Sequence, residues 1–119
     1  MTLIFYDSVE NEQSFTTMVW TQVASKTGHL NTTENLIWLS AEYCATAINK
    51  EVGIRVLVNG NEVSFDYHTC TLANQYRKFC DFGLLSATDG QYTISVEVRA
   101  LTAGVTVKVR KIRLAVMQE

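Results

Sequence analysis

The stretch GQYTISVEVRALTAGVTVKVRKIRLAVM, residues 90–117, carries the most regular pattern in the chain. Apolar and polar side chains alternate from Tyr92 to Val98, which is the period of a half-buried β-strand. After a short break that contains a glycine, the alternation resumes on odd-numbered positions, and it moves to even-numbered positions near Arg110 and Lys111. One extra residue there, a β-bulge, would produce that shift and bend a long strand. The stretch therefore predicts a closed or sandwiched all-β fold.

The composition limits what kind of protein this is. Its 119 residues, 47% hydrophobic and 18% charged, suffice for one two-layer core and leave no room for a second domain. The formal net charge of -2 offers no cluster of Lys and Arg for phosphates, so we expect no nucleic-acid partner. The segment MTLIFYDSVENE lacks the charge and apolar run of a signal peptide or membrane span, and we expect neither.

The cysteines do not suggest a disulfide framework. Cys44, Cys70 and Cys80 cannot all pair within one chain, and we expect reduced thiols in a protein made in a reducing cytosol. A disulfide between Cys70 and Cys80 is the alternative. His68 lies close to Cys70, but the close cysteine pairs of structural zinc sites are missing, so we predict no metal site.

The N-terminal third contains two strand-like segments separated by polar ones. Leu3–Tyr6 is predicted as a short edge strand, followed by a polar loop over residues 7–13. Residues 15–25 are rich in β-formers, and neither face of this segment is wholly polar, so we expect a strand in the interior of a sheet. The Gly, Asn and Thr content of residues 26–33 predicts a loop.

The middle of the chain predicts further strands. Residues 34–47 alternate apolar positions and favour a strand, with a helix as the alternative. Residues 52–66 form a hairpin around Asn59-Gly60, a pair that suits a type I′ turn. Residues 76–87 form one more strand before a turn at residues 88–90. We predict one antiparallel β-sandwich domain of jelly-roll type over residues 1–119, with seven or eight strands. Its predicted buried residues include Tyr92, Ile94, Val96, Val98, Val56, Val58, Leu114 and Val116.

Residues that could carry chemistry are few. The chain contains two histidines, His29 and His68, and neither belongs to a nucleophile elbow, a phosphate-binding loop or a zinc-protease helix. We therefore predict no catalytic residues, no cofactor and no enzyme activity.

Aromatic residues suggest a second kind of site. Exposed rings stack well against the apolar face of a sugar, so a glycan platform is one interpretation of the aromatic residues Trp20, Trp38, Tyr67 and Tyr76. A domain of this size also needs large side chains in its core, and we expect both tryptophans to be buried. Solvent exposure of either tryptophan would favour the platform.

Three segments of the sequence resemble a group of small jelly-roll proteins. They are NLIWLSAEYCATA at residues 35–47, VGIRVLVNGNEV at residues 52–63, and the C-terminal stretch at residues 90–118. In this order they resemble the strands and hairpin of auxiliary virion proteins of tailed bacteriophages, such as capsid decoration proteins and head or tail fibre modules.

The resemblance implies a structural virion protein, made in the host bacterial cytoplasm, that binds major capsid or tail subunits. The alternative is a glycan-binding module such as a tail-fibre or receptor-binding head domain. Residues 1–13 are a candidate N-terminal arm, in which Leu3, Ile4, Phe5 and Tyr6 would add to a neighbouring subunit. Residues 17–23 and 36–45 carry apolar side chains on both faces, so we expect a symmetric homo-oligomer. The resemblance favours a trimer.

Overall fold

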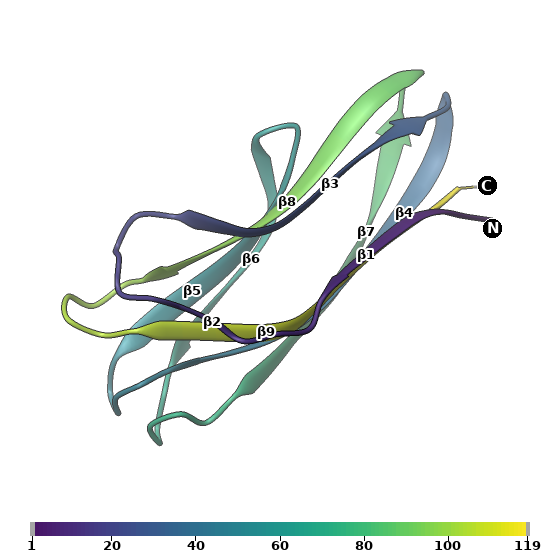
Figure 1. Ribbon diagram of the computed structural model, residues 1–119. Helices are drawn as coiled ribbons and strands as arrows, with labels where there is room; N and C mark the ends of the chain where they lie inside the picture. Colours follow the sequence, from purple (N-terminus) through teal and green to yellow (C-terminus); the bar gives the residue numbers. More distant parts are fainter. Residues whose placement is uncertain (1, 119) are drawn as a thin grey trace.

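Two antiparallel sheets, packed face to face, make up the computed structural model, which describes residues 2–118 (Figure 1). The molecule extends over 45 × 21 × 20 Å. Its elements are β1 (Thr2–Val9), β2 (Gln13–Phe15), β3 (Thr21–Leu30), β4 (Thr33–Ala45), β5 (Glu51–Val58), β6 (Asn61–Thr69), β7 (Arg77–Ala87), β8 (Gly90–Ala100) and β9 (Val107–Gln118). The described residues contain no helix, and hence none that could span a membrane.

The order of the strands is that of a jelly roll. One sheet has the order β1-β9-β4-β7, and the other has the order β3-β8-β5-β6. The short strand β2 pairs with β9 at residues 107–109, whereas β1 pairs with β9 at residues 112–118. The strands β1 and β2 are therefore two pieces of one edge strand, and the nine strands occupy eight positions. The predicted sandwich of jelly-roll type is confirmed.

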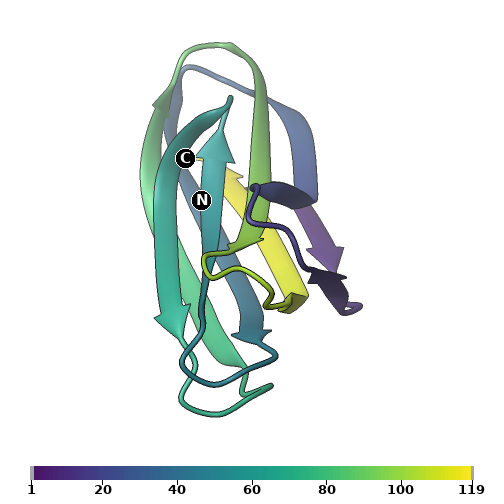
Figure 2. The same cartoon turned by 90° about the vertical axis from the view of Figure 1, so that its left-hand side faces the viewer.

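The connections gather at the two ends of the sandwich. Figure 1 shows the links before β3, after β4, after β6 and after β8 at one end, and the two chain termini toward the other. Figure 2 views the sandwich from the side of these links. The loop before β3 is tied to the loop before β9 by a hydrogen bond between the hydroxyls of Thr16 and Thr106 at 3.0 Å. Both loops are thereby held in place at this end.

The core lies between the sheets and consists mainly of inward-facing aliphatic side chains. Seven of the eight residues predicted to be buried are buried, and the eighth, Tyr92, packs against the core with its ring half-buried. The predicted bulge is at Lys111, whose φ is 50°. Ser40 pairs with Arg113 and Glu42 with Arg110, so one extra residue of β9 faces β4. Because of this extra residue, side chains on both sides of the bulge point into the core.

The predicted hairpin and the ambiguous central segment also have the expected structure. Asn59 and Gly60 have φ values of 50° and 82°, the two positive angles of a type I′ turn. Residues 33–45 form strand β4 and not a helix. This strand lies between β9 and β7, so it is interior to its sheet.

Three predictions about the N-terminal third are wrong. Residues 7–13 are not all loop, because β1 continues to Val9 and pairs with β9. Residues 15–25 are not one interior strand: the chain leaves the first sheet after β2 and enters β3, an edge strand of the second sheet. Residues 26–33 are not a loop, because β3 continues to Leu30 and pairs with β8. Gly28 marks a close packing contact here, since a Cβ at this position would lie 2.5 Å from the ring of Phe5. Strand β3 lies at the edge of its sheet and exposes one face to solvent, so it accommodates the polar residues that suggested a loop.

Candidate functional site

The two histidines do not form a catalytic arrangement. The Nε2 atom of His29 lies 2.8 Å from the Oδ1 atom of Asp89 at the exposed tip of the sandwich. His68 lies edge-on to Tyr43, with 6.2 Å between ring centroids, and burial together with the nearby Arg77 lowers the pKa of His68. Within residues 2–118, no group of three or more His, Cys, Asp and Glu side chains could hold a metal ion.

The three cysteines lie in different environments. Cys44 and Cys70 are buried, and the Sγ atom of Cys70 accepts a hydrogen bond from the backbone nitrogen of Ala45 at 3.1 Å. Burial raises the pKa of the Cys44 thiol above its usual value. Cys80 is exposed on β7, and all three thiols are free.

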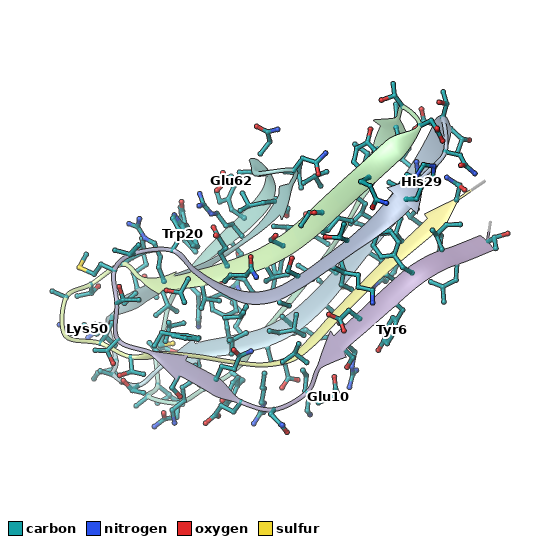
Figure 3. All side chains as sticks on the ribbon, turned by 45° about the horizontal axis from the view of Figure 1, so that its top comes forward. Tyr6, Glu10, Trp20, His29, Lys50 and Glu62 are labelled. Carbon is teal, nitrogen blue, oxygen red and sulfur yellow. The ribbon has the colours of Figure 1, made fainter. Side chains whose placement is uncertain are left out.

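Large apolar side chains gather on the outer face of the sheet β1-β9-β4-β7. The strand register places them in two adjacent rows that cross all four strands. We call this surface the apolar face, and its rows are Tyr6–Ala115–Trp38–Phe82 and Leu3–Met117–Leu36–Leu84. Figure 3 shows Tyr6 on this side of the sandwich, and Trp20 on the opposite side.

The apolar face is open to solvent. Leu84 is 71% exposed, Phe82 is 65% exposed and Leu3 is 57% exposed. Trp38 is 42% exposed and stacks on Phe82, with ring centroids 5.8 Å apart and an interplanar angle of 16°. The prediction that Trp38 is buried is therefore wrong: β4 buries its odd-numbered residues between 35 and 43, so Trp38 points outward.

Charged pairs border the apolar face along β9. Arg113 donates to Glu10 at 2.7 Å, and the hydrogen bonds from Arg113 and Ser8 lower the pKa of Glu10 to about 2. Farther along, Arg110 donates to Glu42 at 2.8 Å and lowers the pKa of that carboxyl. The outer face of this sheet thus divides into an apolar half and a charged half.

The four predicted arm residues lie in β1. This strand pairs with β9 of the same chain, as an ordinary first strand would. Leu3 and Tyr6 point outward into the apolar face, whereas Ile4 and Phe5 pack against the core. A role of these residues in assembly stays a prediction.

The second sheet presents a different outer face, on which aromatic rings lie beside arginines. Tyr67 on β6, Gly53 on β5 and Arg99 on β8 form one cross-strand row, and Trp20 lies just before β3 at the end of this row. Phe65 and Arg55 form part of the next row. We call this surface the aromatic–arginine face, and it consists of Trp20, Gly53, Arg55, Phe65, Tyr67 and Arg99.

Gly53 allows the rings to approach the sheet. A Cβ at this position would lie 2.9 Å from the ring of Tyr67 and 3.2 Å from the ring of Trp20, so both rings lie across the glycine. The Trp20 ring is half-buried, with the guanidinium carbons of Arg55 and Arg99 at 4.4 Å and 5.3 Å from its centroid. These are cation–π distances.

The four predicted stacking residues occupy three separate places. Trp20 and Tyr67 lie together on the aromatic–arginine face, and Trp38 lies on the apolar face. Tyr76 packs against Arg110, whose guanidinium carbon is 3.6 Å from its ring centroid, and its hydroxyl donates to Glu12. The arginines and Gly53 carry no local sequence signal of a site, and only the strand register brings them together with the rings.

One cleft opens between the sheets where the edges of β6 and β7 meet. It has a volume of about 150 Å³ and is lined mostly by apolar side chains, including Ile37, Val56 and Val63. Polar contacts link the two edges beside it: Ser64 donates to Asp81, and Arg77 donates to Asp66 at 2.9 Å. These contacts join the edges of β6 and β7 beside the cleft.

Comparisons with known proteins identify the fold. No family model and no curated protein sequence matches the chain. Among solved structures, it is similar to the insecticidal delta-endotoxin Cry8Ea1 from Bacillus thuringiensis, with a TM-score of 0.59 and 14% identity over 91% of this chain and 20% of that one. It is also similar to the protein of T=1 particles derived from infectious bursal virus, with a TM-score of 0.68 and 9% identity over 97% of this chain and 31% of that one.

A third similar structure is the C-terminal domain of EclA, a sugar-binding protein, with a TM-score of 0.57 and 16% identity over 91% of this chain and 79% of that one. This chain spans less than a third of the toxin and of the viral protein. At these identities the similarity establishes a jelly-roll β-sandwich and no closer relationship.

Proposed function

We propose that this protein is a non-enzymatic structural protein of a tailed bacteriophage virion, of the capsid decoration or stabilising type, which binds other subunits. The apolar face carries this proposal, because soluble monomers rarely expose a contiguous apolar patch that crosses a whole sheet. The resemblance to auxiliary virion proteins and the fold shared with the infectious bursal virus particle protein support a place in a virion.

The size of the apolar face fits a protein partner. Full burial of one large apolar side chain contributes about 1.5–3 kcal/mol. Five such side chains are well exposed here, namely Leu3, Tyr6, Trp38, Phe82 and Leu84. They are 42–71% exposed, so burial of the remaining accessible surface contributes about half of that value for each residue. Summed over two partners, this would offset an association cost of roughly 4–15 kcal/mol.

A second copy of this chain is the partner we propose for the apolar face. Closed cyclic symmetry buries every copy of such a face at once, and a trimer is the state that the resemblance favours. The charged half of the same outer face, with Glu10–Arg113 and Glu42–Arg110, would set the orientation of the contact. The contact with major capsid or tail subunits would then use the remaining surface of the oligomer.

Sedimentation equilibrium at micromolar concentration tests the self-association. We expect the wild-type protein to be larger than 13.4 kDa and the double variant Phe82→Lys/Leu84→Lys to be monomeric. The matched control is Phe65→Lys/Tyr67→Lys, because these residues are 56% and 49% exposed on the outer face of the other sheet. A wild-type monomer contradicts the proposed oligomer, and a dimer keeps the interface while removing the reason for a trimer.

The genomic neighbourhood tests the place in a virion. A position beside a major capsid gene or a tail fibre gene supports this function. A position within a polysaccharide-processing cluster contradicts it and favours the second candidate.

The second candidate is a sugar-binding module, and the pairing of Trp20 with Tyr67 over Gly53 favours it. The similarity to the sugar-binding EclA domain is compatible with this use of the fold. Affinity electrophoresis through gels that contain polysaccharides tests it: we expect retardation of the wild-type protein and loss of retardation in Trp20→Ala. Equal mobility of both proteins in every gel would contradict sugar binding at this face.

A further inference from the structure

We infer that the aromatic–arginine face binds an acidic saccharide, whose ring stacks on the aromatic side chains while its carboxylate or sulfate group pairs with Arg99. This inference deepens the second candidate function and rests on it. It adds the class of sugar and the residue that selects this class.

Arg99 differs from the other arginines in its partners. Arg55 pairs with Glu97 at 2.6 Å and with Glu62 at 3.6 Å. Arg77, Arg110 and Arg113 each pair with a carboxylate as well. Within residues 2–118, Arg99 forms no ion pair, and its buried Nε atom has no hydrogen-bond partner. One positive charge on this face is therefore not neutralised by the protein.

The position of Arg99 suits a ligand that carries both a ring and an anion. It is directly opposite Gly53 in the strand register, between the two rings that lie across this glycine. Its guanidinium group lies over the Trp20 ring, and the Tyr67 ring in the same row is 49% exposed. A sugar that stacks on Tyr67 can therefore direct a carboxylate substituent across Gly53 toward the guanidinium. A guanidinium offers a planar pair of donors that fits carboxylate and sulfate oxygens.

The site is held in place before any ligand arrives. The loop that presents Trp20 is fixed by a hydrogen bond from the backbone nitrogen of Ala100 to the carbonyl oxygen of Thr17 at 2.9 Å. The backbone nitrogen of Val19 donates to the Thr17 hydroxyl at 3.0 Å. A binding site that is already ordered loses less conformational entropy on binding.

The net charge of the chain does not by itself favour the binding of acidic sugars. The chain carries a formal net charge of -2, so polyanions are not attracted to it in general. Binding of an acidic polysaccharide would therefore depend on a local positive group, and Arg99 is the arginine with no acidic partner on the described chain. The alternative is that Arg99 only packs against Trp20 as a structural cation–π contact.

Titration calorimetry with three probes tests the inference: polygalacturonate, which carries carboxylates, dextran sulfate, which carries sulfates, and neutral dextran. The variants are Arg99→Met, which keeps the aliphatic stem, Arg99→Lys, which keeps the charge, and Trp20→Ala. Lys78→Met is the control, because it removes one positive charge from the opposite outer face. Thermal unfolding establishes that each variant is folded.

We expect the wild-type protein to bind at least one acidic probe at least about tenfold more tightly than dextran. Arg99→Met and Trp20→Ala should each weaken that binding by about tenfold or more, Arg99→Lys should weaken it less, and Lys78→Met should leave it unchanged. Polygalacturonate and dextran sulfate distinguish a carboxylate ligand from a sulfate ligand.

Three results would overturn the inference. If dextran binds as tightly as the acidic probes and Arg99→Met changes nothing, the sugar-binding function stands and the selection by Arg99 falls. If Arg99→Met and Lys78→Met weaken acidic binding equally, the attraction is non-specific. If no probe binds, both the inference and the sugar-binding candidate fall.

Discussion

The two outer faces of this sandwich each hold a tryptophan, but the side chains around the two rings differ. Trp38 on the apolar face stacks on Phe82 and has Leu84 nearby in the adjacent row. Trp20 on the aromatic–arginine face lies beside the guanidinium groups of Arg55 and Arg99. Burial of the apolar face against a protein is favourable, because it removes apolar surface from water. The charged groups of the aromatic–arginine face remain hydrated or need a polar ligand.

The comparison shows that an aromatic residue alone does not indicate the kind of partner. The cross-strand neighbours of the ring indicate the kind of partner, because they determine whether the surface around the ring is apolar or charged. Both faces belong to one fold, so substitutions on one face should leave the other unchanged. The predictions below use this independence.

The largest effect is expected from the core that both faces share. Val96→Asp places an unpaired carboxylate between the sheets, and we expect a loss of at least about 4 kcal/mol of unfolding free energy, enough to unfold the domain. Self-association through the apolar face and sugar binding at the aromatic–arginine face should be lost together. Ser95→Asp, one residue away on the outer side of β8, is the control and should remain folded. Circular dichroism and thermal melts measure the outcome, and a Val96→Asp variant as stable as the parent would contradict the core assignment.

A smaller effect, limited to one face, is expected for Gly53→Val. The new side chain would occupy the space of the Trp20 and Tyr67 rings, whose atoms lie 3.2 Å and 2.9 Å from the first added carbon. Displacing the rings should cost about 1–3 kcal/mol of stability and remove sugar binding. The oligomeric state in sedimentation equilibrium should not change. A change in oligomeric state would show that the two faces are not independent.

The tryptophans should report the two faces separately in acrylamide quenching of fluorescence. In a Trp20→Phe variant, the remaining Trp38 should become easier to quench on dilution, because dissociation of the oligomer exposes the apolar face. In a Trp38→Phe variant, quenching of Trp20 should not depend on protein concentration. The same concentration dependence in both variants would contradict the assignment of the apolar face as the interface.

The smallest effect is expected at the charged border of the apolar face. The pKa of Glu10 is about 2 in the folded protein and 4.5 without its partners, so its pairing with Arg113 stabilises the fold above pH 4.5. This contribution should be lost as the pH falls from 4.5 toward 2. It should be small, because the pair is exposed and screened by salt. Between pH 4.5 and 2, the melting temperature should fall slightly less with pH for Glu10→Gln than for the parent. An equal fall in both proteins would contradict the prediction.

Much of the fold follows from local pattern. The alternation from Tyr92 to Val98, the phase shift at Lys111 and the Asn59-Gly60 turn each predicted the observed geometry, because all three depend on the chain near those residues. The errors concern segments whose state depends on distant partners. The mainly polar residues 26–30 form a strand because they pair with β8, sixty or more residues later in the chain.

The candidate sites were less predictable than the fold. Trp38 was expected in the core because large aromatic residues usually help to fill one, but the alternation of β4 places it outside. Gly53 and Arg99 carry no local signal of a site. They become part of one only because β5 and β8 are neighbours in the second sheet.

The sequence by itself therefore determined an antiparallel β-sandwich, most of its strands, its bulge and its tightest turn, since these depend on backbone preferences and on the period-2 alternation of side chains. Only the tertiary structure decided which side chains share a surface. Strand order and register bring together residues far apart in the sequence, as with Tyr6, Trp38 and Phe82 on one face and Trp20, Gly53 and Arg99 on the other. Hydrophobic pattern specifies which residues point inward, but long-range pairing specifies which outward residues are neighbours.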